Sequence, residues 1–213
     1  MNYSSIVDIK KLAFEYFTAL QSCDLLPYKA RLSSPELNTH RQNQPLLKAI
    51  IFGGTNNLAR AKLPEARYEE RSSGAVQTDI SSRELKYFDE TGRVFVHPSS
   101  IMFQATKIRS GFLTWVNKQI TTKPFLRDCA EVGHWPILLL GTLKMNTEAH
   151  GIVLENQMRM RCWNRIGYLS AALRRLLAAE LEQMFEQPSI AASGDQLSAV
   201  IETMLQLIEL DGA

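Results

Sequence analysis

The chain has 213 residues, of which 45% are hydrophobic and 22% charged, and its formal net charge is only +2. This composition is typical of a globular protein with one core, or with one core and a helical appendage. No apolar run approaches the roughly 20 residues of a membrane span, so no membrane partner is expected, and the N-terminus lacks the order of a secretory signal. Three scattered cysteines without a CxxC motif predict free thiols in a reducing compartment, nuclear or cytoplasmic.

The small net charge hides a strong asymmetry along the chain. Residues 83–127 contain eight Lys and Arg against three acids, a balance of +5, and residues 156–175 contain five Arg and no acid. Residues 176–213 contain seven acids and no base. The basic segments suit a polyanion, whereas the acidic end suits a protein partner or a lid over the basic surface.

The chain begins with a predicted amphipathic helix over residues 5–21. Ser5 and Asp8 have the spacing of a capping box, and apolar residues then recur at helical intervals. Residues 27–45 are polar and contain three prolines, which predicts a loop. Residues 1–45 are therefore expected to be the end of a preceding helical domain plus a linker.

A mainly β region is predicted for residues 46–162. A short helix starting at Pro45 should end at Gly53-Gly54, and NLARAKL can form a first strand. Residues 64–82 are interpreted as an irregular loop. LKYFDETGRVFV then predicts a hairpin, GFLTWVNKQI and PFLRDCAEV two strands, HWPILLLG a helical turn, and residues 142–161 nearly a second hairpin.

Five to seven short strands with regular turns thus predict the fold class α+β, mainly β, as a small barrel or a sandwich flanked by helices. The C-terminal region 163–213 is predicted to be a helical extension. A strong helix covers residues 163–186, Pro188 and Gly194 mark a break, and a last amphipathic helix covers residues 195–210.

Motifs for autonomous catalysis are missing. No GxxxxGK[ST], GxGxxG or GxSxG motif occurs, and the four histidines lack metal-ligand spacing. Cys129 and His134 lie close in sequence, but a buried structural thiol is the simpler interpretation. An unrelated small enzyme is therefore the least favoured hypothesis for the function of this chain.

Several segments, read in order, resemble the C-terminal OB-fold region of DEAH-box RNA helicases of the RNA-helicase-A-like group. The segments are LLKAIIFGGTNNLARAKL, GRVFVHPSSIMF and PFLRDCAEVGHWPILLLG, and the His-Pro-Ser-Ser turn is the most specific part. The resemblance implies that residues 46–162 form an OB-fold domain, a small OB-like five-stranded barrel, and the chain is similar to a helicase fragment without its motor. The resemblance implies no cofactor and no catalytic residue in this fragment, whereas the parent would be an ATP-dependent helicase that uses ATP and Mg.

The resemblance also implies single-stranded RNA as a partner, held near the exit of the RNA channel, with the helicase core of the same parent as a second partner. The predicted RNA-binding residues are His97, Ser99, Ser100, Lys107, Arg109, Lys123 and Arg127. Serine hydroxyls and lysine and arginine side chains can hold phosphates, and a histidine can stack on a base. The HPSS residues could instead only cap a strand. A protein-docking module that recruits a helicase regulator or ribonucleoprotein partner is the alternative function.

Overall fold

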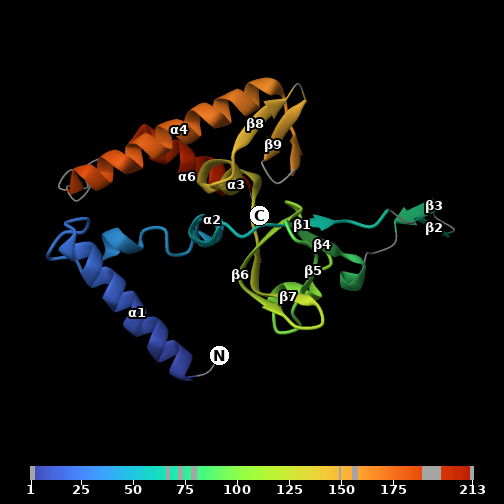
Figure 1. Cartoon of the computed structure of the whole chain (residues 1–213), viewed down its shortest axis with the longest axis horizontal. Coiled ribbons are helices and arrows are strands. Elements are labelled where there is room, and N and C mark those ends of the chain that lie inside the picture. The colour runs from blue at the N-terminus through green and yellow to red at the C-terminus, as the bar shows by residue number, and fades with distance from the viewer. Residues whose placement is uncertain are drawn as a thin grey trace.

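The structure is a computed structural model that describes residues 3–65, 68–71, 74–77, 81–148, 150–154, 158–188 and 198–211. Its helices are α1 (Tyr3–Ser22), α2 (Gln44–Thr55), α3 (His134–Leu140), α4 (Asn164–Glu186) and α6 (Ala199–Asp211) (Figure 1). Its strands are β1 (Ala59–Lys62), β2 (Tyr68–Arg71), β3 (Gly74–Gln77), β4 (Lys86–Asp89), β5 (Gly92–Val96), β6 (Phe112–Ile120), β7 (Pro124–Glu131), β8 (Met145–Glu148), β9 (Gly151–Leu154) and β10 (Arg159–Arg161). Three short 3-10 helices, η1 (Pro35–Asn38), η2 (Ser82–Glu84) and η3 (Ile101–Gln104), lie in the connections.

Five strands form a closed barrel in the order β1-β4-β5-β7-β6, with β6 pairing back to β1. All neighbours are antiparallel except β5 and β7, which run parallel. Numbered among the barrel strands alone, this order is 1-2-3-5-4, and closure removes the free edges of the sheet. The predicted five-stranded barrel flanked by helices is confirmed.

The barrel core shows where the chain departs from simple strand alternation. Its buried residues are Ala59, Leu85, Tyr87, Val94, Val96, Ile108, Leu113, Trp115, Leu126 and Cys129. Leu126 and Cys129 both point inward although they are three residues apart, an odd spacing that regular alternation forbids. Asp128 between them has a φ of +53°, and this left-handed residue reverses the face that β7 presents to the core.

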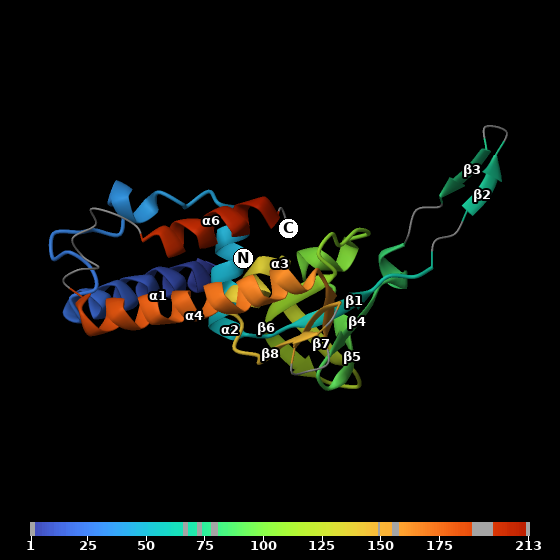
Figure 2. The same ribbon diagram turned by 90° about the horizontal axis from the view of Figure 1, so that it is seen from above.

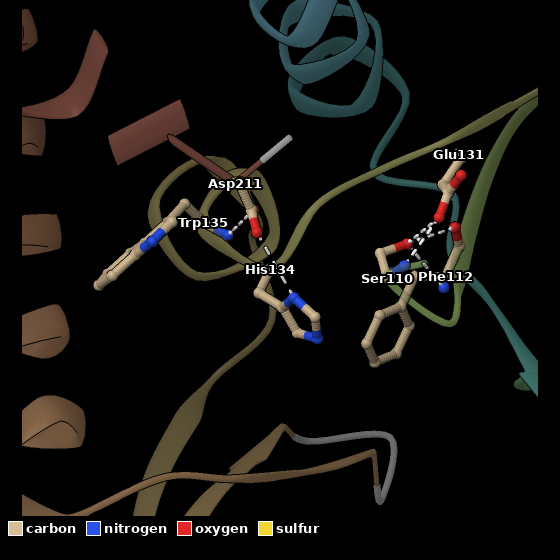
Figure 3. Close-up of polar contacts among 6 residues, drawn as sticks. All are labelled: Ser110, Phe112, Glu131, His134, Trp135 and Asp211. Atoms are coloured by element: carbon tan, nitrogen blue, oxygen red, sulfur yellow. Dashed lines mark hydrogen bonds and ion pairs between the residues drawn. The ribbon is translucent and has the colours of Figure 1, made fainter. Parts of the chain in front are cut away.

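The helix α3 has only seven residues. Side chains from the C-terminal helices form hydrogen bonds with backbone groups at both of its ends. The backbone N–H of Trp135 donates to the Asp211 carboxylate of α6 at 2.8 Å (Figure 3). The Arg174 guanidinium of α4 donates to the carbonyls of Gly141 and Leu143 at the other end. A Cβ on Gly133, the residue before α3, would collide with the Asp211 carboxylate, so the glycine permits this close approach.

The helices α2, α3 and α6 pack around a second small core of Leu46, Ala49 and Ile208. The acidic helix α6 therefore packs on α2 and α3 and also contacts α4, which carries part of the second basic segment. That the acidic end acts as a lid over the basic surface stays a prediction. The apolar face of this amphipathic helix is used largely inside the molecule, because Met204 and Leu205 also pack against this core.

A separate three-stranded sheet, β10-β9-β8, follows the barrel and packs its inner face against α4 and α3. The predicted second hairpin thus has a third strand. The hairpin β2–β3 lies in the connection between the first two barrel strands and projects away from the rest of the molecule (Figure 2). The irregular loop predicted for residues 64–82 is therefore wrong over residues 68–71 and 74–77, because their backbones pair with each other.

Two predicted helix ends also need correction. α1 begins at Tyr3, before the proposed Ser5 cap. α2 continues through both glycines to Thr55, and Asn56 with a φ of +52° ends it instead. Asparagine tolerates the left-handed conformation better than other non-glycine residues, which explains the stop. The region of Gly194 lies outside the described residues.

Candidate nucleic-acid interface

A row of aromatic rings covers the outer face of the barrel where β5 and β7 run side by side. Val94 and Val96 point inward, so Arg93, Phe95 and the following His97 face outward. Phe95 lies opposite Phe125 of β7, and their ring centroids are 6.1 Å apart. The His97 ring meets Phe125 edge to face at 5.9 Å.

Cationic side chains surround these rings. The Arg93 guanidinium and the Lys123 ammonium lie 4.8 Å and 4.9 Å from the centroid of the Phe95 ring. The Arg127 guanidinium lies 3.0 Å from Nε2 of His97. We call Arg93, Phe95, His97, Lys123, Phe125 and Arg127 the Phe95 surface. Aromatic rings among positive charges are the two components that bind single-stranded nucleic acids.

His97 is held by contacts on both of its ring nitrogens. Its Nε2 lies 3.0 Å from the Arg127 guanidinium. The Ser99 backbone N–H donates to Nδ1 at 3.1 Å, and the Ser99 hydroxyl lies 2.7 Å from the same nitrogen. These contacts orient the imidazole and Arg127 at the edge of the aromatic row. The Nε atom of Arg127 is buried without a hydrogen-bond partner among the described residues.

A groove of about 430 Å³ adjoins the Phe95 surface. It lies over β4 and β5 and is closed on one side by η3, the 3-10 helix that follows the HPSS turn. Its lining residues are Ser82, Leu85, Lys86, Tyr87, Arg93, Val94, Phe95, Val96, Met102, Phe103, Gln104 and Phe125. The combination of Phe95, Phe103 and Phe125 with Lys86 and Arg93 makes the groove both apolar and cationic, with room for a nucleobase.

The structure brings together four of the seven predicted site residues. His97, Ser99 and Arg127 are linked by hydrogen bonds, and Lys123 reaches the same surface through Phe95. Ser100 is only 8% exposed, and its hydroxyl accepts from the Met102 backbone to begin η3. Its side chain is thus turned to the interior, which is the local capping role that the sequence left open.

The remaining two predicted residues, Lys107 and Arg109, are exposed in the connection between η3 and β6 and do not line the groove. Sequence reasoning missed Arg93, Phe95, Phe103 and Phe125. A signal existed in the alternation RVFVH, which places an arginine, a phenylalanine and a histidine on one face of a strand.

Among the described residues, no group of three or more His, Cys, Asp or Glu could hold a metal ion. Cys129 is 3% exposed, and burial raises the pKa of its thiol to about 11, so the thiolate that nucleophilic chemistry needs is disfavoured. None of the helices in the described ranges has the length and apolar character to cross a membrane.

Comparison with known families agrees with this architecture. Residues 46–143 match the family described as "Oligonucleotide/oligosaccharide-binding (OB)-fold", a range that includes most of α2, all five barrel strands and α3. The chain therefore contains an OB-fold domain of the kind that DEAH-box helicases carry in their C-terminal region.

The relatives are helicases. The chain is 35% identical over 189 residues, 80% of its length, to a protein named as a DEAH-box ATP-dependent helicase in Mycosarcoma maydis. It is 24% identical over 98% of its length to a protein named as an ATP-dependent RNA helicase in Saccharomyces cerevisiae, and 25% identical over 82% to the human "ATP-dependent DNA/RNA helicase DHX36". It spans 12%, 19% and 17% of the lengths of these relatives.

Proposed function

We propose that this chain is an accessory module of a DEAH-box RNA helicase and that it holds single-stranded RNA on the Phe95 surface and in the adjoining groove. The observation that carries the proposal is the pair Phe95–Phe125 with Arg93, Lys123 and Arg127 around it. OB-folds bind oligonucleotides on the face of their second and third strands and with the loop between the fourth and fifth. Here that face is β4–β5, and the loop is residues 121–123.

The same proposal includes the position of this module in the parent helicase. The module holds RNA near the exit of the helicase channel, the rest of the parent protein uses ATP and Mg, and this chain hydrolyses nothing by itself. The helix α1 supports docking on the helicase core, because Ile9, Leu12, Phe14 and Tyr16 are each about half exposed or more, at 48–68%. The parent would act in the reducing environment of the nucleus or cytoplasm.

A titration of the chain into a labelled uridine-rich single strand, followed by fluorescence anisotropy, tests the RNA site. Phe95→Ala should weaken binding about 5- to 100-fold, the equivalent of one stacked base. Lys123→Ala should weaken it less and should reduce the dependence of log K on log salt by about 0.7. The matched control changes Lys10 and Phe14 of α1 to alanine, which removes the same side-chain types away from the groove.

If the α1 variant and the groove variants lose the same affinity, the Phe95 surface is not the RNA site. If the chain binds no RNA even at low salt, the alternative function gains weight. That alternative is the recruitment of a protein regulator or ribonucleoprotein partner, and the exposed apolar residues of α1 are the observation that favours it.

A further inference from the structure

The most exposed tryptophan of the chain lies outside the barrel, at the start of α4. Trp163 is 84% exposed, whereas Trp115 is 7% exposed in the barrel core and Trp135 of α3 is half-buried against two clusters of core residues. A tryptophan gains more from burial than almost any other side chain. An indole displayed to solvent on a structured element therefore suggests a surface that is covered by a ligand.

Arginines flank this indole along the chain on both sides. In β10, Met160 is buried, and the flanking Arg159 and Arg161 face outward. Arg165 is exposed in the first turn of α4, which contains no acid. These three arginines form no ion pair among the residues that the structure describes. We call His150, Arg159, Arg161, Trp163 and Arg165 the Trp163 surface.

The register of the small sheet places the parts of the Trp163 surface together. Arg161 lies opposite Gly151 of β9, so His150 is at the end of the strand that borders Arg161. A Cβ at Gly151 would collide with the Met160 carbonyl, and the glycine thus keeps β9 and β10 close. The acid nearest in register is Glu148, opposite Gly151 on the next strand, β8.

A shallow hollow of about 560 Å³ lies at this point and is lined by His150, Arg161, Cys162, Trp163 and Asn164. In this hollow the indole can stack on a base, and the guanidinium can bind the phosphate of the same nucleotide. An apolar protein partner would leave three desolvated arginines unpaired, which is costly. A single-stranded nucleic acid supplies both a π-face for Trp163 and anions for the arginines.

We infer that the Trp163 surface is a second binding site for single-stranded nucleic acid, with one base stacked on Trp163 and the neighbouring phosphates held by Arg159, Arg161 and Arg165. This site extends the proposed function. It rests on the proposed function only in taking a single-stranded nucleic acid as the class of ligand. It lies on β9, β10 and α4, and it shares no residue with the groove on the barrel. A strand long enough to reach both surfaces gains avidity, because the second contact becomes intramolecular.

The emission of Trp163 provides a direct test, because Trp115 is buried and Trp135 is half-buried. The chain is titrated with a uridine-rich strand of about 6 nucleotides, a length that one surface can hold, while emission and acrylamide quenching are recorded. We expect stacking to quench Trp163 and to protect it from acrylamide. Trp163→Phe should remove this signal but keep binding, and Trp163→Ala should weaken the site about 5- to 100-fold.

The arginine contribution is tested with a matched pair. Arg161→Ala should weaken the quenching response and reduce its salt dependence, whereas Arg175→Ala, which removes an exposed arginine further along α4, should change neither. Equal losses in the two variants would mean that only net charge matters, and the inference would fail. It would also fail if poly-glutamate protected Trp163 as well as the strand does, since that result would assign the surface to an acidic protein.

The same titration in the Phe95→Ala, Lys123→Ala background separates this inference from the proposed function. In one outcome, the strand still quenches Trp163, and the barrel substitutions do not change the anisotropy. This outcome would support the Trp163 surface and overturn the groove on the barrel. Binding that depends on Phe95 while Trp163 emission stays unchanged would overturn the Trp163 surface and keep the groove.

Discussion

Asp128 is the residue that lets one strand serve both the barrel core and the Phe95 surface. Its left-handed φ of +53° separates Arg127, which faces outward beside His97, from Cys129, which is 3% exposed in the core. The Asp128 carboxylate accepts a hydrogen bond from the Asn117 amide at 3.4 Å. The reversal therefore depends on the backbone conformation more than on a strong side-chain contact.

Substitution at Asp128 should therefore follow backbone preference. Asp128→Gly should change the free energy of unfolding by less than about 1 kcal/mol, because relief of the left-handed strain offsets the extra entropy of glycine. Asp128→Val should lower it by about 1–3 kcal/mol, since a β-branched residue is poorly tolerated there. Urea unfolding of the two variants checks this order, and equal losses would show that the aspartate side chain matters instead.

Asp89 ends β4 with a carboxylate that is only 1% exposed and lies 2.6 Å from the Lys118 ammonium. Burial disfavours its ionised form, but hydrogen bonds from Lys118 and Thr91 together outweigh burial and lower the pKa of Asp89. A lowered folded-state pKa means that this carboxylate stabilises the fold above its unfolded pKa, near 3.8. That contribution is lost as the pH falls through the folded value.

The Asp89–Lys118 pair gives a prediction for both stability and pH. Lys118→Met should lower the free energy of unfolding at neutral pH by about 2–4 kcal/mol, because it leaves a buried carboxylate unpaired. The double variant Asp89→Asn, Lys118→Met should recover part of that loss. The difference between wild type and Asp89→Asn should shrink as the pH drops below 3.8. Unfolding curves at several pH values measure it, and a constant difference would contradict the assignment.

At the scale of elements, α3 is the least autonomous helix of the molecule. Seven residues are too few for a stable isolated helix. Asp211 accepts from the Trp135 N–H in its first turn, and Arg174 donates to the carbonyls of Gly141 and Leu143 just beyond its last residue. The contact with Asp211, whose Oδ1 lies 3.6 Å from Nδ1, raises the pKa of His134 although partial burial opposes this. The end of α6 is thus fixed to the start of α3 by a hydrogen bond and an ion pair.

The His134 contact predicts a modest loss of stability with rising pH. A raised folded-state pKa means that the ion pair stabilises the fold fully below the unfolded pKa near 6.5 and is lost as the pH rises through the folded value. For a half-exposed pair the effect should be at most about 1 kcal/mol. His134→Gln should abolish this pH dependence, as seen in melting temperatures between pH 6 and 8.

Asp211→Asn separates the two parts of the same contact. It keeps an acceptor for the Trp135 N–H but removes the charge, so it should abolish the pH dependence and retain most of the cap. Asp211→Ala removes both and should cost about 1–2 kcal/mol. If Asp211→Asn and Asp211→Ala unfold alike, the backbone of Trp135 does not depend on this carboxylate.

At the scale of the whole molecule, the sequence predicted what depends on local patterns. The hairpin of β4 and β5 follows from two alternating apolar runs around a turn, and His97 and Arg127 follow from motifs near strand ends. The pairing of Phe95 with Phe125 depends on a parallel register between distant strands, which no local pattern encodes. The cap from Asp211 lies 76 residues from Trp135, and the hairpin β2–β3 is too polar to show strand alternation.

Residues 163–213 were expected to form a separate extension, and stability measurements can test whether they unfold together with the barrel. Ile208 of α6 is fully buried against Leu46 and Ala49, whereas the nearby Leu210 is 81% exposed. Ile208→Ala should lower the free energy of unfolding by about 2–4 kcal/mol, and Leu210→Ala should change it by less than about 0.5 kcal/mol. If α6, α2 and α3 form one unit with the barrel, Ile208→Ala should speed amide hydrogen exchange equally in α6 and in the barrel strand β6. Faster exchange confined to α6 would instead show that the C-terminal helix unfolds alone, and RNA binding by the Phe95 surface would then be independent of it.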